Sequence, residues 1–169
     1  MRLNIGAGGD TEEGWEPWDI SQGNDCRDMA LLAAGTVSEI RASHVLEHIP
    51  RADTLGALRE WRRVLRLGGR LFVAVPDFEL VARAFLAGAP DPNIESYIMG
   101  GQTDENDFHF ALFTEGKLRD LLRMAGFSRV MRTASEGTRW NCSRHWCSLN
   151  MEAFADGEDT RGNPEARAR

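Results

Sequence analysis

A short apolar strand that runs directly into a cluster of glycines constrains this chain more than any other feature. Residues 3–9 read Leu-Asn-Ile-Gly-Ala-Gly-Gly. Because glycine carries no Cβ, the backbone at such a bend can approach a ligand closely. A Gly-x-Gly pair by itself fits an ordinary tight turn equally well. The bend therefore predicts either a turn or a ligand contact, and the residues that follow must decide between them.

An acidic residue closes the next apolar stretch, residues 15–20. Asp19 follows Gly8 by eleven positions, and an acid at the end of a second strand can accept hydrogen bonds from both ribose hydroxyls of a nucleoside. A dinucleotide site needs a helix N-terminus for the pyrophosphate and an acid roughly 20 residues further on. The short spacing leaves little room for that helix. It favours a nucleoside ligand without phosphate, such as S-adenosylmethionine, over a nicotinamide dinucleotide.

Strands and helices alternate along the chain, which is typical of an α/β domain with a mostly parallel sheet. We expect strands at 3–5, 15–20, 26–29, 37–42, 70–75, 127–133 and 146–154, and helices at 51–67, 78–86 and 114–125. The predicted architecture is Rossmann-like, with helices on both faces, a reduced first helix and a C-terminal antiparallel hairpin. Ligands of such sheets bind at the carboxyl ends of the strands.

Helix boundaries are predicted from capping residues. Asp53 can cap the helix at 51–67, and the glycines at 68–69 can end it. Thr114 can cap the start of the helix at 114–125, and Gly126 can end it. Residues 87–107 are rich in Gly, Pro, Asp and Asn, so we expect a long loop or lid there.

Length and charge narrow the class of protein. The 169 residues fit one domain at 1–155, with a polar tail at 156–169 that we expect to be disordered. The formal net charge of −6 disfavours nucleic acid as a partner. No apolar run reaches the roughly 18 residues of a membrane helix, and the N-terminus lacks signal-peptide features. We therefore expect a cytoplasmic protein without a membrane partner.

Three cysteines do not form a disulfide framework or a recognisable zinc pattern. Residues 142–147 read Cys-Ser-Arg-His-Trp-Cys, and no second pair lies elsewhere. This spacing matches none of the standard zinc-ligand spacings. The sequence therefore predicts no metal site.

Several segments together carry a family resemblance. They read Leu-Asn-Ile-Gly-Ala-Gly at 3–8, Trp-Glu-Pro-Trp-Asp-Ile at 15–20, Ala-Ser-His-Val-Leu-Glu-His-Ile at 42–49, Leu-Arg-Glu-Trp-Arg-Arg-Val-Leu-Arg-Leu-Gly-Gly-Arg-Leu at 58–71, Val-Pro-Asp at 75–77 and Phe-Thr at 113–114. In this order they resemble a compact, type 11-like branch of the class I S-adenosylmethionine-dependent methyltransferases. The resemblance covers residues 3–154, and departs from the usual pattern at Ala7, Glu39 and Leu67.

The resemblance implies a methyltransferase with S-adenosylmethionine as cofactor and S-adenosylhomocysteine as product. Its cofactor-binding residues would be Gly6, Ala7, Gly8, Asp19, Ile20, Asp28, Met29, Ser43 and His44. The glycine bend would line the methionine part of the cofactor, and Asp19 would hold its ribose. The adenine would contact Ile20, Asp28 and Met29. From the residues alone, Asp28 fits a capping or turn role equally well.

Methyl transfer needs alignment of nucleophile and methyl carbon, and removal of a proton where the acceptor is a hydroxyl. Histidine is the side chain suited to that proton transfer near neutral pH. The candidate bases are His44, His48 and His109, with His44 favoured because it is nearest a strand end. Each also fits a structural or surface histidine.

The acceptor is the least defined part of the expectation. Acidic residues around the lid make polyanions poor substrates; they are Asp91, Glu95, Asp104, Glu105 and Asp107. Fold-level analogy favours a small-molecule or sugar-type acceptor, methylated on oxygen or nitrogen. The alternatives are a non-catalytic S-adenosylmethionine-binding or partner-binding module and, less favoured, a nicotinamide-dependent oxidoreductase. A homodimer is compatible with the sequence.

Overall fold

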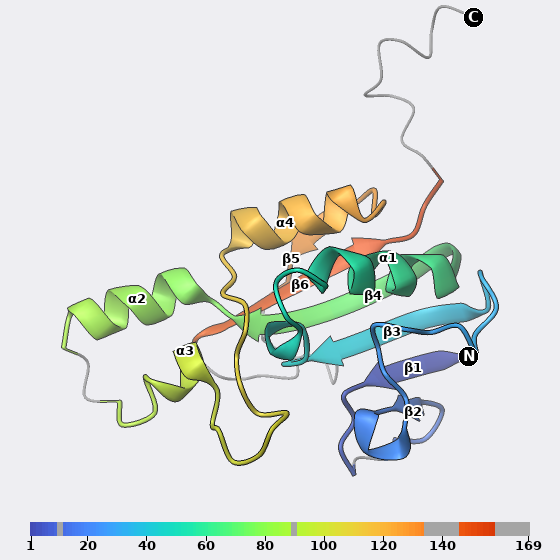
Figure 1. Cartoon of the computed structure of the whole chain (residues 1–169). Helices are drawn as coiled ribbons and strands as arrows, with labels where there is room; N and C mark the ends of the chain where they lie inside the picture. Colours follow the sequence, from blue (N-terminus) through green and yellow to red (C-terminus); the bar gives the residue numbers. More distant parts are fainter. Residues whose placement is uncertain (10–11, 89–90, 134–145, 158–169) are drawn as a thin grey trace, which may run out of the picture.

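A six-stranded sheet in the order β2-β1-β3-β4-β6-β5 forms the centre of the computed structural model (Figure 1). The structure describes residues 1–9, 12–88, 91–133 and 146–157. Four strands run parallel: β1 (Arg2–Ile5), β2 (Glu16–Trp18), β3 (Val37–Ser43) and β4 (Leu65–Pro76). The strand β6 (Ser148–Phe154) lies antiparallel to β4 and to the edge strand β5 (Val130–Arg132). The predicted mostly parallel sheet with an antiparallel C-terminal pair is confirmed.

The two longest helices lie over one face of the sheet. They are α1 (Thr54–Val64) and α4 (Glu115–Met124), which pack side by side in Figure 1. Their apolar stripes bury Leu58, Trp61, Leu118 and Leu122 completely. This layer is the hydrophobic core that fixes the strands in place.

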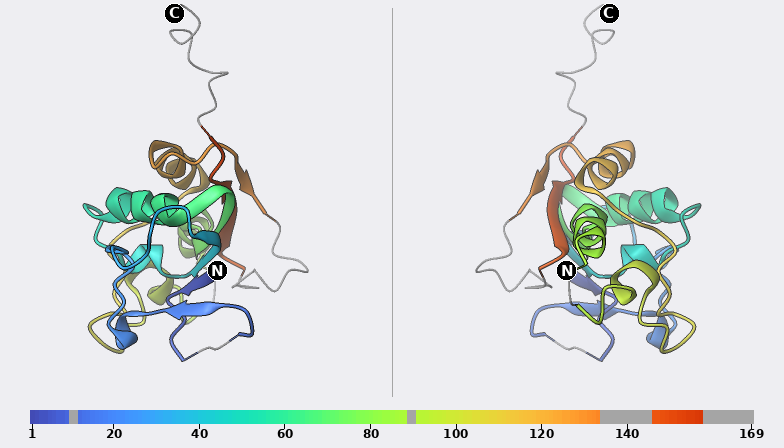
Figure 2. Two further views of the ribbon diagram at one scale, coloured as in Figure 1. Left: turned by 90° about the vertical axis from the view of Figure 1, so that its right-hand side faces the viewer. Right: turned by 90° about the vertical axis from the view of Figure 1, so that its left-hand side faces the viewer.

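The other helices lie away from that layer. Both α2 (Phe78–Leu86) and α3 (Ser96–Met99) extend past the carboxyl ends of the strands, as Figures 1 and 2 show. The short 3-10 helices η1 (Ile20–Gln22) and η2 (Leu46–His48) follow β2 and β3.

The face of the sheet opposite α1 and α4 differs from the expectation of helices on both faces. Within the described residues it carries polar side chains in place of a helix: Arg41 Nε donates to Asn4 Oδ1 over 3.0 Å, and Arg41 also pairs with Glu12. The guanidinium lies over the ring of Trp15 as well.

The helix predicted at 51–67 is shorter than expected. It ends at Val64 because Leu65 already pairs with Val37 of β3, so strand pairing overrides the helical periodicity. Gly68 and Gly69 do not end the helix; they lie inside β4, where the register with β3 shifts. Asp53 occupies the cap position of α1, but its side chain makes no capping hydrogen bond.

The short strand expected at 26–29 is wrong, because residues 26–27 form a turn and residues 28–29 have no regular secondary structure. The expected helix at 78–86 matches α2, and Thr114 caps α4 by accepting from the backbone of Lys117. Between β1 and β2 the described residues form turns, so the predicted reduction of the first helix is confirmed there. The tail at 158–169 and Cys142 to His145 lie outside the described residues.

Among the described residues, no helix is both long and apolar enough to cross a bilayer.

Candidate ligand-binding cleft

A cavity of about 520 Å³ opens at the carboxyl ends of β1, β2 and β3. Its wall combines these strand ends with the loop after η1, the segment around η2 and the acidic loop at 103–107. The lining residues are Ile5, Gly6, Trp18, Asp19, Ile20, Asn24, Asp25, Cys26, Arg27, His44, Val45, His48, Ile49, Pro50, Thr103, Asp104, Glu105, Asn106, Asp107 and Phe110. The size and position fit a small-molecule site of an α/β sheet.

Gly6 forms the floor of the cavity and tolerates no side chain. Its φ of 66° lies in the left-handed region, and a Cβ there would come within 2.3 Å of Val45 Cγ2. Its backbone N–H donates to Trp18 O over 2.9 Å, which joins the ends of β1 and β2. The glycine is therefore required by its backbone angle and by the close approach of Val45, and it is one of the residues that line the cavity.

Asp19 lies at the junction of β2 and η1 and lines the cavity, although only 8% of the residue is exposed. Its carboxylate accepts from Gly8 N at 2.8 Å, from Ser21 N at 2.9 Å and from Ser21 Oγ at 2.6 Å. Burial acts to raise the pKa of Asp19, but the hydrogen bonds from Ser21 and Gly8 together outweigh it and lower the pKa. The side chain is a fixed, ionised acceptor at the rim.

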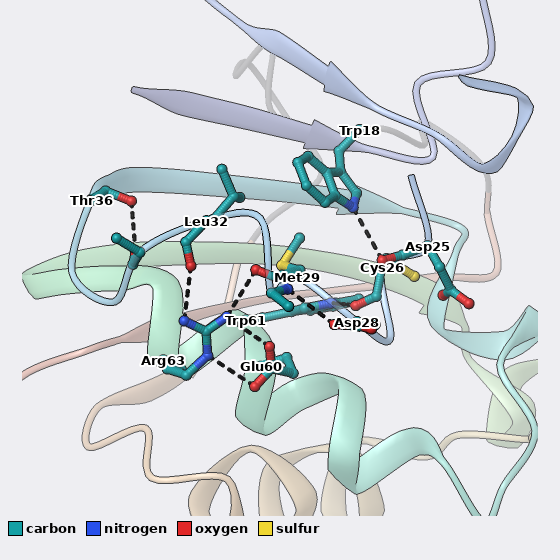
Figure 3. A network of polar contacts seen from close by, with 12 residues as sticks. Trp18, Asp25, Cys26, Asp28, Met29, Leu32, Thr36, Glu60, Trp61 and Arg63 are labelled. Carbon is teal, nitrogen blue, oxygen red and sulfur yellow. Dashed lines mark hydrogen bonds and ion pairs between the residues drawn. The ribbon is translucent and has the colours of Figure 1, made fainter. Parts of the chain in front are cut away.

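Asp25 and Cys26 reach the cavity because the 25–32 segment is tied to its surroundings at several points (Figure 3). Trp18 Nε1 donates to Asp25 O over 3.2 Å, and Trp61 Nε1 donates to Cys26 O over 2.9 Å. Arg63 donates to the carbonyls of Met29 and Leu32 over 2.9 Å and pairs with Glu60. Two helix side chains of α1 thus hold the loop against the core.

The same loop places Asp28 and Met29 away from the cavity. Asp28 is exposed, and its Oδ1 accepts from Ala30 N over 3.0 Å in a local turn. Met29 is fully buried in the core. Neither residue lines the cavity. From this loop, Asp25 and Cys26 line it instead.

His44 follows β3 with a φ of 51°, an unusual backbone angle for a residue other than glycine. Its Nδ1 lies 2.9 Å from Oε1 of Glu47, whose carboxylate is buried. Its Nε2 lies 3.4 Å from Ser148 Oγ, and the ring lines the cavity. The pairing with Glu47 favours a proton on Nδ1 and leaves Nε2 as the acceptor.

His48 lines the cavity, and His109 packs edge-on against it with ring centroids 4.7 Å apart. His109 is not a lining residue, and burial lowers the pKa of its imidazole. Ser43 and Ala7 also lie outside the lining set, and Gly8 contributes its N–H to Asp19. Of the predicted residues, the cavity therefore brings together Gly6, Asp19, Ile20, His44 and His48.

Sequence reasoning missed part of the wall. Asp25 and Arg27 form a bidentate pair beside the cavity, and hydrogen bonds from Arg27 lower the pKa of Asp25. The acidic loop at 103–107 was visible as a charge cluster, but its placement over the strand ends depends on contacts distant in sequence.

No protein-family model matches the chain. An uncharacterized 37.1 kDa protein in transposon TN4556 of Streptomyces fradiae is 35% identical over 80 residues. That match covers 42% of this chain and spans only 23% of the Streptomyces protein.

Solved structures give a broader match. An S-adenosylmethionine-dependent methyltransferase of Thermotoga maritima, a possible histamine N-methyltransferase, aligns with a TM-score of 0.58 at 16% identity. The alignment covers 92% of this chain and 82% of that one. The 1,6-didemethyltoxoflavin-N1-methyltransferase of Burkholderia thailandensis, solved with S-adenosylhomocysteine, aligns with a TM-score of 0.56 at 16% identity over 92% and 71% of the two chains.

These alignments, together with the strand order, identify the fold. The chain has the class I S-adenosylmethionine-dependent methyltransferase fold, as its sequence motifs predicted.

Proposed function

We propose that this protein binds S-adenosylmethionine in the cavity at the strand ends and transfers its methyl group to a small acceptor. The observation that carries the proposal is the meeting of Gly6 and Asp19 on one cavity wall. An open backbone floor beside a fixed carboxylate suits a nucleoside with an attached amino acid. Ile20, with 52% of the residue exposed, offers an apolar surface to the base.

Charge on the cavity wall supports the same ligand. Five carboxylates line it, at Asp19, Asp25, Asp104, Glu105 and Asp107, whereas Arg27 is the one arginine or lysine among the lining residues. S-adenosylmethionine carries a sulfonium and an ammonium, so its two positive centres outnumber its carboxylate. An acidic wall attracts such a cation and repels the pyrophosphate of a dinucleotide.

The proposed chemistry is an in-line displacement at the methyl carbon. The acceptor forms a bond to that carbon while the carbon–sulfur bond breaks, and sulfur keeps the electron pair as a neutral thioether. The enzyme aligns the reactants and excludes water. Where the acceptor is a hydroxyl, its proton passes to Nε2 of His44, whose ring is oriented by Glu47.

The proposed acceptor is a small molecule or a sugar carrying a hydroxyl or amine. A cavity of about 520 Å³ has room for the cofactor and a modest acceptor, and the acidic wall disfavours polyanions such as nucleic acid. The methyltransferase fold supports the reaction type, and the Thermotoga and Burkholderia neighbours are themselves described as methyltransferases.

Calorimetry with purified protein tests the cofactor directly. We expect S-adenosylmethionine and S-adenosylhomocysteine to bind at one site per chain, and NAD not to bind. Tight binding of NAD would contradict the proposal. Incubation with S-adenosylmethionine and an acceptor library, read out as S-adenosylhomocysteine by mass spectrometry, then tests turnover. Binding without turnover for every acceptor would favour the non-catalytic module.

A further inference from the structure

Three side chains with metal-binding atoms converge between η2 and the segment after the acidic loop. A carboxylate oxygen of Glu47 and ring nitrogens of His48 and His109 all lie within 4.8 Å of one another. Zinc ligands with bonds of 2.0–2.1 Å are separated by about 3.3 Å, so small side-chain rotations would close this set around an ion. Nothing in the family resemblance requires these three residues to meet.

Both imidazoles are held in the orientation that metal-binding histidines show. Nδ1 of His48 lies 3.2 Å from Phe108 O, and Nδ1 of His109 lies 3.3 Å from Tyr97 O. A backbone carbonyl can only accept, so each Nδ1 carries the proton and each Nε2 keeps a lone pair. A histidine that binds a metal ion nearly always donates its second ring N–H to such a carbonyl or carboxylate.

Glu47 contributes a buried carboxylate with a hydrogen-bond partner at only one of its two oxygens. Its residue is 1% exposed; Oε1 contacts His44, whereas Oε2 has no hydrogen-bond partner. An unpaired carboxylate oxygen away from water is costly unless a cation or donor meets it. Ligand atoms of His48 and His109 lie within 4.8 Å of this carboxylate and of each other, so the two imidazoles could share an ion with it.

The backbone fixes the three residues relative to one another. Phe110 N and Ala111 N both donate to Glu47 O, over 2.8 Å and 3.2 Å, and His109 N donates to Met99 O over 3.0 Å. These bonds hold the 108–111 segment against η2, sixty residues earlier in the chain. The two histidines and the carboxylate are therefore presented on rigid backbone, as a metal site requires.

We propose that Glu47, His48 and His109 bind one divalent transition-metal ion of the zinc type. Two imidazoles and a carboxylate form a known three-ligand set that leaves a fourth position open. Since His48 lines the cavity, an ion held by this residue would lie at the edge of the proposed ligand site. The metal site itself does not depend on methyl transfer. The further idea that an oxygen of the methyl acceptor becomes the fourth ligand rests on the proposed function.

Zinc titration of the full chain, first stripped with a chelator, tests the site. We expect close to one Zn²⁺ per chain, with affinity reduced at least about tenfold in Glu47→Gln and in His109→Gln. Circular dichroism shows whether each variant is folded. Glu79→Gln, which removes a carboxylate charge from an exposed ion pair on α2, should keep the affinity of the wild type. The double variant Cys142→Ser/His145→Gln should keep it as well.

The proposal is overturned if the wild type binds no zinc, or if both site variants retain the binding. Co²⁺ loading provides a second readout that does not depend on the variants. A thiolate-to-cobalt charge-transfer band would place the ion at a cysteine and also overturn the site. Zinc anomalous diffraction from wild-type crystals should give a peak at Glu47, His48 and His109. Titration with S-adenosylmethionine is measured separately, so failure of either site is distinguishable from failure of the other.

Discussion

The backbone N–H of Gly8 donates to Oδ2 of Asp19 over 2.8 Å and so links the loop after β1 to the end of β2. A carboxylate has about four acceptor positions. Gly8 N takes one, and Ser21 takes two through its N–H and its hydroxyl. One position remains, and the Ser21 hydroxyl can rotate to free another. The carboxylate is thus held rigidly while it can still accept from a pair of ribose hydroxyls.

Replacing that carboxylate should weaken cofactor binding. We expect Asp19→Ala to lose about 1–3 kcal/mol of S-adenosylmethionine affinity, or about 5–150-fold in Kd, because buried hydroxyls of the ligand lose their partner. Asp120→Ala, on the exposed side of α4, is the matched control and should bind as the wild type does. Calorimetry gives both constants. An Asp19→Ala protein with unchanged Kd would remove the residue from the site.

The depressed pKa of Asp19 predicts a specific pH dependence of stability. Its folded-state pKa lies below the ordinary value of 3.8, so its ionised form stabilises the fold above that value, and the contribution is lost as pH falls further. Urea denaturation should show wild type more stable than Asp19→Asn at pH 6–8. The difference should shrink below about pH 3.8. A gap that stays constant as the pH falls below 3.8 would contradict this origin.

The glycine bend offers a matched pair of substitutions. Gly6→Ala places a Cβ against Val45 and keeps a strained positive φ, so we expect it to cost about 1–3 kcal/mol and to impair cofactor binding. Gly9→Ala meets no atom within 4 Å and has no positive φ. Thermal denaturation of the two variants should separate them clearly. Equal melting temperatures would argue against the close approach.

Cys26 lines the cavity but should be a poor nucleophile. Burial is the main cause that raises the pKa of its thiol to about 12, and burial raises that of Cys147 to about 11. Thiolates are the reactive species, so both should resist iodoacetamide at pH 8 until the protein is denatured. Peptide mass spectrometry assigns the labelled positions. Rapid native labelling of Cys26 would show that its surroundings are more polar than described.

The proposed base can be tested once turnover with a hydroxyl acceptor is found. His44→Gln should lower kcat by about 10²–10⁴ while leaving the Kd for S-adenosylmethionine within a few-fold of wild type. Ser148→Ala removes only the weak contact at Nε2 and should have a small effect. Steady-state kinetics gives kcat, and calorimetry gives the Kd for S-adenosylmethionine. A His44→Gln enzyme with unchanged kcat would leave His44 with a structural role.

Local signals made part of this molecule predictable. The capping Thr114 marks the start of α4, and the glycine bend with Asp19 locates the cavity, because these features depend on neighbouring residues. The end of α1 was not predictable in this way. Leu65 joins the sheet through Val37, a contact almost thirty residues distant, and this pairing overrides the helix pattern.

The remaining errors have the same origin. Trp61 and Arg63 pull residues 26–32 toward α1, and this turns Asp28 outward and brings Asp25 to the cavity. His109 meets His48 because backbone bonds tie the 108–111 segment to Glu47. Such long-range contacts leave no periodic or spacing signal in one sequence. The positions of Asp25 and His109 could therefore be found only from the folded structure.

A crystal structure of the protein with S-adenosylhomocysteine tests the central claim most directly. The account predicts the nucleoside in the cavity at the strand ends, with its ribose hydroxyls within hydrogen-bond distance of the Asp19 carboxylate and its amino-acid part over Gly6. A ligand bound elsewhere, or a ribose held by other residues while Asp19 keeps only its bonds to Gly8 and Ser21, would contradict it.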